Sequence, residues 1–297
     1  MQPRTFDYLY FKTHGHSNEE IRQETGLSLE EIEIMEKALR PVLEEIEAER
    51  PKAKTIGADF ARLTRYIYAD KSDQEQGTPR PDAIKARSGE VFALPAVAKL
   101  DFGKTSLQDA ILQRRSLRKY SDEPLSLQEL SFLLYCSSWA RDFRSNERME
   151  ITLRNVPSAG SRHPIETFVD IRRVTGLKPG LYYYHPIKHC LVLYDESPEI
   201  QDQIFEGCFR QEMIQSSAAN FIYTAVPYRT CWRYGQRGYR YLYLDAGHIG
   251  QNLHLAAEAV SAGACMIGAY LDEAMNEALK IDGSEEFVIY IATVGKK

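Results

Sequence analysis

Cysteine is scarce in this sequence, and no two cysteines stand at a metal-binding spacing. The five cysteines are odd in number, lie far apart and form no Cys-x-x-Cys motif. Neither a disulfide framework nor a zinc site is indicated, and we expect no bound metal. Such cysteine usage is typical of a protein that works in a reducing cytoplasm.

Long apolar runs and an excess of positive charge are also missing. No apolar run approaches the roughly 20 residues of a membrane-spanning helix, and the first residues, MQPRTFDYLYFK, lack the apolar core of a signal peptide. The formal net charge is −5, which gives the molecule no electrostatic attraction to nucleic acid or to anionic membranes. We therefore expect neither as a partner.

Several common catalytic motifs are absent as well. The sequence contains no Gly-x-Ser-x-Gly, His-Glu-x-x-His, P-loop or Gly-x-Gly-x-x-Gly pattern, so hydrolase, zinc-enzyme and nucleotide-loop functions lack support. His248 and His254 are six positions apart in the sequence and would not share one face of a helix. That spacing argues against a metal site between them.

Residues 1–80 are predicted to form a helical extension that ends in a linker. Capping boxes begin at Ser17 and Ser28, and an apolar stripe at helical spacing follows, which predicts two helices over 17–50. This stretch resembles a helix-turn-helix, but it has eleven acidic and four basic residues, which opposes contact with DNA phosphates. A docking or dimer-embracing role is expected instead. Residues 70–90 are polar and predict an exposed linker.

The remaining residues, 90–297, are predicted to form one α+β domain. Two helices come first, antiparallel-looking strands follow, and the chain ends in the order helix, strand, helix, strand. The helices are expected over 106–115, 126–139, 241–262 and 272–279, and the strands over 167–174, 181–184, 191–194, 221–226, 264–270 and 287–294.

A basic segment at 114–118 is the first candidate for chemistry. Arg114, Arg115 and Arg118 surround Ser116, and guanidinium groups bind a phosphate dianion through paired hydrogen bonds. If the preceding helix continues, Arg114 and Arg118 lie one turn apart and share a face. The alternative is a set of cations that neutralises the end of a helix.

Two further segments are rich in small residues, which allow a backbone to approach a planar ligand closely. PSAGSRHP at 157–164 predicts a tight loop, and MIGAY at 266–270 predicts a strand that ends in small residues. Free backbone N–H groups at the end of that strand could donate to a flavin. A plain surface turn and a strand packed closely on a helix are the respective alternatives.

The segment WRYGQRGYRY at 232–241 interleaves Arg, Tyr and Gly. This pattern suits contact with an aromatic cofactor or an anionic peptide, and equally an interface between subunits. The segment leads into LDAGHIGQN at 244–252. There we interpret Asp245 and His248 as a pair at the start of a helix rather than as a catalytic dyad.

Taken together and in this order, these segments resemble the nitroreductase superfamily, specifically its SagB-type branch of thiazole/oxazole dehydrogenases. The resemblance covers about residues 105–297. It implies a nitroreductase-like α+β fold with an antiparallel-rich central sheet flanked by helices, a domain-entwined homodimer, and FMN bound between the subunits. The matching segments are RRSLRKY at 114–120, PSAGSRHPIE at 157–166, YGQRGYRYLYLDAGHIGQN at 234–252, IGAYLDE at 267–273 and IDGSEEFVIYIATVG at 281–295.

The resemblance also implies which residues would hold the cofactor. Arg118 would lie near the N1/O2 edge of the flavin, where a cation stabilises the anionic reduced ring. A C-terminal basic residue, Lys296 or Lys297, is a further candidate for the phosphate. The other assignments are the phosphate and ribityl chain to Arg114, Arg115 and Ser116, the ring to Pro157, Ser158, Ala159 and Gly160, and N5 and O4 to the backbone of Gly268 and Ala269.

Three residues are candidates for catalysis. In azole-forming members of the family a Lys-Tyr pair supplies the base, and the matching place here holds Arg233 and Tyr234. Because arginine stays protonated it cannot accept a proton as lysine does, which leaves Tyr234 to relay it. His163 is another acid or base if it faces the flavin, since a histidine ordinarily titrates near pH 6.5.

The expected function is that of an FMN-dependent dehydrogenase or oxidase of a small or peptide-derived substrate. An NAD(P)H-dependent reductase of nitro compounds or quinones is the second candidate, because an open flavin stacks many flat acceptors. A third is a non-catalytic scaffold subunit that keeps the fold and acts through its acidic helices. The intact Arg-Arg-Ser sequence argues against the third.

Overall fold

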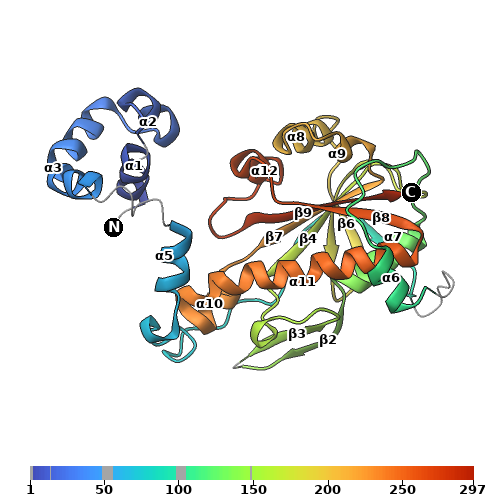
Figure 1. Ribbon diagram of the computed structural model, residues 1–297. Helices are drawn as coiled ribbons and strands as arrows, with labels where there is room; N and C mark the ends of the chain where they lie inside the picture. The colour runs from blue at the N-terminus through green and yellow to red at the C-terminus, as the bar shows by residue number, and fades with distance from the viewer. Residues whose placement is uncertain (1–2, 14, 49–55, 98–104, 148) are drawn as a thin grey trace. The chain divides into compact units, whose positions relative to one another are not determined.

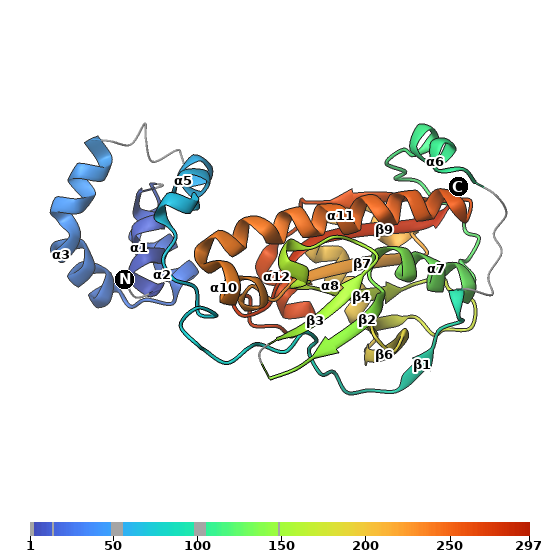
Figure 2. The same cartoon turned by 90° about the horizontal axis from the view of Figure 1, so that it is seen from below.

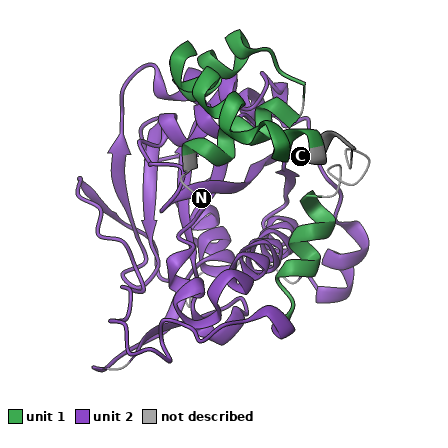
Figure 3. Cartoon of the chain, turned by 90° about the vertical axis from the view of Figure 1, so that its left-hand side faces the viewer, with its two compact units in different colours: residues 1–65 green, residues 66–297 purple. Residues whose placement is uncertain are grey.

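The chain forms two compact units, residues 1–65 and residues 66–297, which Figure 3 shows in different colours. Within the described residues, the first unit contains only helices and the second contains all the strands. All the predicted cofactor and catalytic residues belong to the second unit. The computed structural model describes residues 3–13, 15–48, 56–97, 105–147 and 149–297.

The helices of the first unit, as far as it is described, are α1 (Pro3–Thr13), α2 (Asn18–Thr25), α3 (Leu29–Ala48) and α5 (Ile56–Leu63). α2 begins at a capping box in which the Ser17 hydroxyl and the Glu20 carboxylate each accept the other residue's backbone N–H. It ends at Gly26, whose φ of +67° is left-handed. Side chains of α1, α2 and α3 pack around Tyr8. The two helices predicted over 17–50 are confirmed, whereas α1 was not predicted.

Within the described residues, a seven-stranded antiparallel sheet forms the centre of the second unit (Figure 1). Its strand order is β1-β6-β5-β4-β7-β9-β8, and all neighbouring strands pair antiparallel. The six predicted strands are confirmed, and β1 was missed. The strands are β1 (Val91–Ala93), β4 (Ile165–Ile171), β5 (Gly180–His185), β6 (Cys190–Asp195), β7 (Ala219–Ala225), β8 (Ala262–Ile267) and β9 (Phe287–Lys296).

Alternating side chains of the strands serve two apolar layers, one on each face of the sheet. In β7, Phe221 belongs to the first layer and Ile222 to the second. The first layer includes α7 (Leu127–Ser137) and α11 (Gly238–Ala259), and the second includes α8 (Ile200–Gly207), α9 (Glu212–Ser216) and α12 (Asp272–Ala278). Figure 1 shows α11 across one face and α8, α9 and α12 over the other. The predicted α+β architecture, an antiparallel-rich sheet flanked by helices, is confirmed.

A two-stranded hairpin, β2 (Ala140–Ser145) and β3 (Glu150–Arg154), lies beside the sheet and was not predicted (Figure 2). Its first strand, ARDFRS, is too polar to show the alternation of a half-buried strand. α6 (Leu107–Gln113) and α10 (Tyr228–Tyr234) complete the helices that bear on the site. None of the helices in the described ranges is long and apolar enough to cross a membrane.

Residues 72–90, which we call the strap, are not the exposed linker that their composition predicts. The Trp232 indole N–H donates to the Thr78 carbonyl over 3.0 Å, and Arg80 pairs with Glu150 over 2.6 Å. Several side chains of the strap, among them Arg80 and Asp73, therefore have partners in the rest of the unit. Composition alone cannot distinguish such a fixed segment from a solvated one, because the partners are distant in sequence.

Candidate functional site

The basic segment at 114–118, which we call the arginine segment, does not continue the helix before it. α6 ends at Gln113, and the next residue, Arg114, has φ and ψ of −47° and 126°, which are not helical. Ser116 then pairs in parallel with Ala264 of β8. The expectation that Arg114 and Arg118 share a helical face is therefore wrong, because pairing with the strand replaces the helix.

The guanidinium groups of Arg114, Arg115 and Arg118 have no carboxylate partner among the described residues. Arg115 donates to the carbonyl oxygens of Leu112 and Arg114, and Arg118 donates to that of Ser116. A backbone carbonyl carries no formal charge, and both Arg115 and Arg118 are exposed. The arginine segment therefore carries uncompensated positive charge, which suits an anion with several oxygen atoms.

The C-terminal end of α11 adds a buried group near Arg114. His254 is 6% exposed, and its Nδ1 has no hydrogen-bond partner in the described part of the chain. Burial and the Arg114 cation lower the pKa of His254, so the ring is neutral. Lys297, one predicted phosphate ligand, instead pairs with Glu258 over 2.5 Å, and Lys296 also has a carboxylate partner. Both C-terminal lysines are thus already compensated in this chain.

The segment at Gly268 and Ala269 directly follows β8, the strand that Ser116 joins through Ala264. Both residues are exposed, and a Cβ added at Gly268 would meet no heavy atom within 4 Å. At about 3.3 Å per residue along a strand, Gly268 lies roughly 13 Å from Ala264. The structure therefore places two of the predicted cofactor segments along one strand, with open backbone at its end.

The loop at 157–163, which we call the glycine loop, follows the β2–β3 hairpin and has an unusual backbone. Its φ angles are +59° at Gly160, +53° at Ser161 and +43° at His163. The last two residues have a Cβ and therefore adopt this left-handed conformation at a cost in free energy. Such a loop keeps its shape only if surrounding groups hold it.

The glycine loop meets the Arg233–Tyr234 pair at Gly160. A Cβ on Gly160 would lie 2.6 Å from the Tyr234 hydroxyl oxygen and 3.4 Å from the Arg233 Cδ. Tyr234 packs edge-on against Tyr241, with ring centroids 5.0 Å apart, and the Arg233 guanidinium lies 5.6 Å from the Tyr234 ring centroid. Two segments that are distant in sequence are thus neighbours, and glycine is the residue that leaves room for the hydroxyl.

Asp245 of α11 lies near the glycine loop, a proximity that the sequence analysis missed. Ser158 and Ala159 of that loop oppose the effect of burial on the pKa of the Asp245 carboxyl. Asp245 is 4% exposed, and its Oδ2 has no partner among the described residues. Burial raises the pKa of this carboxyl.

The interpretation of Asp245 and His248 as a pair at a helix start is wrong, because α11 begins earlier, at Gly238. Asp245 lies inside the helix between Leu242 and Ala246, which both belong to the apolar core. An aspartate in the buried stripe of a helix was the signal in the sequence, since buried carboxylates are rare unless a partner holds them.

His163 is buried rather than open to a ligand. The residue is 5% exposed. Burial, together with the charges of Arg154 and Arg162, lowers the pKa of its imidazole to about 2. The imidazole is therefore neutral at ordinary pH and a weak proton acceptor. Its acid–base role stays a prediction, and these surroundings favour a structural role.

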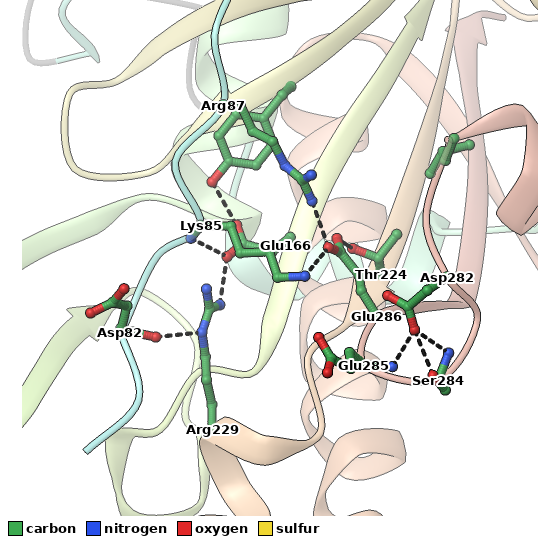
Figure 4. Close-up of polar contacts among 12 residues, drawn as sticks. Asp82, Lys85, Arg87, Glu166, Thr224, Arg229, Asp282, Ser284, Glu285 and Glu286 are labelled. Carbon is green, nitrogen blue, oxygen red and sulfur yellow. Dashed lines mark hydrogen bonds and ion pairs between the residues drawn. The ribbon is translucent and has the colours of Figure 1, made fainter. Parts of the chain in front are cut away.

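A pocket of about 700 Å³ lies elsewhere in the second unit, between the strap and α10. Its volume is within the range of small-molecule sites, yet its wall contains none of the predicted site residues. Lys85 and Arg229 line it, and both belong to a buried ionic network (Figure 4).

In that network the buried carboxylates are matched by cations. Glu166 pairs with Arg229 over 2.5 Å, and both side chains are 1% exposed. Glu286 pairs with Lys85 over 2.8 Å and with Arg87 over 2.5 Å (Figure 4). Because Lys85 and Arg87 belong to the strap, the network fixes the strap to the sheet. Its charges are satisfied within the chain.

Comparisons with known proteins find relatives for the second unit. The profile described as "Nitroreductase family" matches residues 111–296. The chain is 34% identical over 198 residues to MJ1384, a candidate nitroreductase of Methanocaldococcus jannaschii, which covers 66% of this chain and 94% of that protein. The trifolitoxin-processing protein TfxB of Rhizobium leguminosarum bv. trifolii is 27% identical over 194 residues, 64% of this chain and 52% of TfxB.

Among solved structures, that of a candidate nitroreductase from Anabaena variabilis is 33% identical, with a TM-score of 0.53. The match covers 64% of this chain and 38% of the Anabaena chain. The chain therefore spans about half the length of TfxB and less of the Anabaena protein. The predicted fold class agrees with these matches.

Proposed function

The chain belongs to the nitroreductase family, and from that premise we propose that it is an FMN-dependent dehydrogenase or oxidase of a small or peptide-derived substrate. The arginine segment carries the proposal. Its three guanidinium groups lack carboxylate partners among the described residues, and Ser116 between them pairs with β8, the strand that precedes the exposed Gly268. A cofactor with a phosphate at one end and a flat ring at the other fits this combination.

The remaining residues fit FMN as well. Among the buried polar atoms that lack a hydrogen-bond partner in the described residues, two lie on α11: Asp245 Oδ2 near the glycine loop and His254 Nδ1 near Arg114. They are nine residues apart, or about 14 Å along the helix at 1.5 Å per residue. The part of the predicted site near the glycine loop and the part near the arginine segment therefore each contain a buried polar atom without a hydrogen-bond partner among the described residues.

In the proposed site Arg114, Arg115 and Ser116 hold the phosphate and ribityl chain, and Arg118 lies at the ring edge. Bound FMN would supply the two-electron acceptor of the reaction. Tyr234 is the residue that we assign to proton transfer, since its hydroxyl lies against Gly160 of the glycine loop. The Arg233 guanidinium, 5.6 Å from the centroid of the Tyr234 ring, orients that ring.

We propose that the working form is a homodimer. α6 and α11 contact each other, and each exposes large apolar side chains. An apolar surface of this kind is more typical of an interface than of a free face. Leu244→Glu should convert the dimer to a monomer in sedimentation analysis, and a wild type that sediments as a monomer would contradict the proposal. The exposed side chains are Leu107, Ile111 and Leu112 of α6 and Tyr243 and Leu244 of α11.

Two relatives point to different substrates. TfxB is named for the processing of trifolitoxin, which favours the dehydrogenase of a peptide-derived substrate and assignment to the SagB-type branch. MJ1384 is named as a candidate nitroreductase, which favours an NAD(P)H-dependent reductase of nitro compounds or quinones. Rapid loss of flavin colour on addition of NADPH, without oxygen, would favour the reductase.

An absorption spectrum of the purified protein tests the cofactor. We expect the two bands of oxidised flavin and release of FMN on heating. A colourless protein that FMN cannot reconstitute would contradict the proposal and would favour the scaffold subunit.

Tyr234→Phe tests the catalytic assignment. Loss of the hydroxyl should slow turnover about 100-fold or more while FMN stays bound, because a positioned proton donor or acceptor commonly contributes that much. Tyr241→Phe is the matched control, since it removes the hydroxyl of the ring that packs against Tyr234. Equal turnover of the Tyr234→Phe variant and the wild type would remove Tyr234 from the mechanism.

A further inference from the structure

The glycine loop and α10 run alongside each other in opposite directions. Next to the antiparallel pairing of β4 with β7, the Val226 N–H donates to the Pro164 carbonyl oxygen over 2.8 Å. At the other end of this stretch, a Cβ on Gly160 would meet the Tyr234 hydroxyl oxygen at 2.6 Å. The strand pairing therefore leads directly into the contact between the glycine loop and the residue that we assign to proton transfer.

Arg162 joins the two segments between these contacts. Its Nε–H donates to the Arg229 carbonyl oxygen over 2.9 Å, and its guanidinium carbon lies 5.2 Å from the centroid of the Trp232 ring. Arg229 and Trp232 both belong to α10. Arg162 Nη1 donates to the Glu150 carbonyl oxygen of β3 over 3.2 Å. One side chain thus connects the glycine loop, β3 and α10, because a planar guanidinium donates in several directions and stacks on a ring.

The backbone on either side of Arg162 needs support. Ser161 and His163 have left-handed φ angles although each has a Cβ, whereas Arg162 between them has a φ of −78°. Within the loop, the His163 N–H donates to the Ser158 hydroxyl oxygen over 2.9 Å. A backbone conformation that costs free energy persists only where neighbouring groups hold it.

Hydrogen bonds and a ring, rather than an ion pair, hold the Arg162 guanidinium. The residue is 1% exposed, it forms no salt bridge with a described residue, and its Nη2 has no hydrogen-bond partner there. The Glu150 carboxylate pairs with Arg80 instead. Because a buried cation needs groups of opposite partial charge around it, the two carbonyl oxygens and the face of the Trp232 ring determine where this guanidinium lies.

We infer that Arg162 is a positioning residue, which fixes the glycine loop against α10 and thereby sets the approach of Gly160 to the Tyr234 hydroxyl. The inference rests on the proposed function for the flavin ring on the loop and for the role of Tyr234. The connection of the loop to α10 through Arg162 does not depend on that function. A change at Arg162 should therefore alter the loop with and without flavin.

The test combines hydrogen exchange without flavin and FMN titration of the same full-length variants. Arg162→Met removes the donors and the charge and keeps a long apolar chain. The Ser161 amide, which donates to the Ser158 carbonyl oxygen, should exchange at least about tenfold faster. FMN should bind at least about tenfold more weakly, and the visible circular dichroism of bound flavin should change.

Arg162→Lys separates the hydrogen-bonding geometry from the charge. Lysine keeps the positive charge but lacks the planar fork that reaches the Arg229 and Glu150 carbonyl oxygens while it stacks on Trp232. A positioning role predicts that this variant resembles Arg162→Met, with Ser161 exchange at least about threefold faster than in the wild type. If Arg162→Met does not fold, Arg162→Lys carries the test.

Arg173→Met is the matched control. Arg173 Nη2 also donates to two backbone carbonyl oxygens that are distant in the sequence, those of Ser121 and Ser216, outside the glycine loop and α10. Its loss should lower the melting temperature. Exchange of the Ser161 amide and the circular dichroism of bound flavin should stay as in the wild type.

Three outcomes would overturn the inference. Unchanged Ser161 exchange in Arg162→Met would show that the loop does not depend on this side chain. Exchange in Arg162→Lys that equals the wild type would show that the charge suffices, and an equal rise in Arg173→Met would show a general loss of stability. A wild type that binds no FMN would instead refute the proposed function, while the exchange measurements would still test the connection.

Discussion

Two groups of arginines in the second unit differ in what their charges meet. Under the strap, Arg87 and Arg229 each pair with a buried glutamate over 2.5 Å. In the arginine segment, Arg115 and Arg118 are exposed, and among the described residues they donate only to backbone carbonyls. The comparison teaches that the partner, and not the residue type, separates an arginine of the fold from an arginine of a site. The first kind should affect stability and the second ligand affinity.

The largest effect is expected where a buried pair is broken. Arg229→Met leaves Glu166 buried without its closest cation, which should cost about 3–5 kcal/mol in the free energy of unfolding. Denaturant unfolding measures this cost, and FMN affinity of the folded variant should stay near that of the wild type. A loss of less than about 1 kcal/mol in the free energy of unfolding would show that the arginines paired with buried glutamates do not stabilise the fold as proposed.

The next effect is expected in the arginine segment. Arg115→Ala should weaken FMN binding about 10- to 100-fold, because a charge-assisted hydrogen bond to phosphate contributes about 1.5–3 kcal/mol. Its unfolding curve should match that of the wild type, since Arg115 has no carboxylate to leave unpaired among the described residues. FMN binding at wild-type affinity would overturn the assignment of the phosphate.

Lowering the pH provides a further test of the Arg229–Glu166 pair, because protonation removes the negative charge of Glu166. Burial raises the pKa of Glu166, but the cations of Arg229 and Arg154 prevail and hold it below its ordinary value. A lowered pKa gives stability that is present above the unfolded-state pKa of about 4.3 and is lost as the pH falls through the folded-state value.

In Arg229→Met the Arg154 cation and the Tyr183 hydrogen bond still oppose the effect of burial, but without Arg229 the Glu166 carboxylate takes up its proton at a higher pH than in the wild type. The stability difference between wild type and Arg229→Met should therefore be full at neutral pH and should narrow as the pH falls through the folded-state pKa of Glu166 in the variant. Unfolding curves at several pH values measure the difference. A gap that stays constant down to acid unfolding would argue against this ion pair.

The smallest effect is expected for an arginine that is both exposed and paired. Arg210 pairs with Glu206 over 2.8 Å on the surface of α8, where solvent screens the charges. Arg210→Ala should leave the unfolding midpoint and FMN affinity unchanged. A clear loss of FMN affinity in Arg210→Ala would show that the absence of a carboxylate partner does not distinguish the arginines that bind FMN from the others.

The fold could be predicted where the local sequence shows which residues are buried. β7 is buried on both faces and its sequence, ANFIYTA, is mostly apolar. The apolar residues of α11 that face the core recur at helical spacing and are visible in the sequence. The strap escaped prediction because partners distant in the sequence hold several of its side chains, such as Glu150 for Arg80. β2 escaped prediction because its mostly exposed sequence, ARDFRS, shows no alternation of apolar and polar residues.

The site was predictable in its parts but not in its assembly. The small residues of the glycine loop and the basic residues of the arginine segment are visible in sequence. The pairing of Ser116 with Ala264 and the contact of Gly160 with Tyr234 are not visible, because each joins segments that only the tertiary fold brings together. Asp245 was assigned to the start of a helix because α11 begins at Gly238, earlier than the predicted start at 241.

The most direct test of the central claim is a comparison of FMN with riboflavin, which has the same ring and no phosphate. If the arginine segment binds the phosphate, the wild type should bind FMN at least about 100-fold more tightly than riboflavin, and Arg115→Ala should narrow that ratio to about tenfold or less. Equal affinities of the wild type for the two flavins, or a ratio that Arg115→Ala leaves unchanged, would contradict the account.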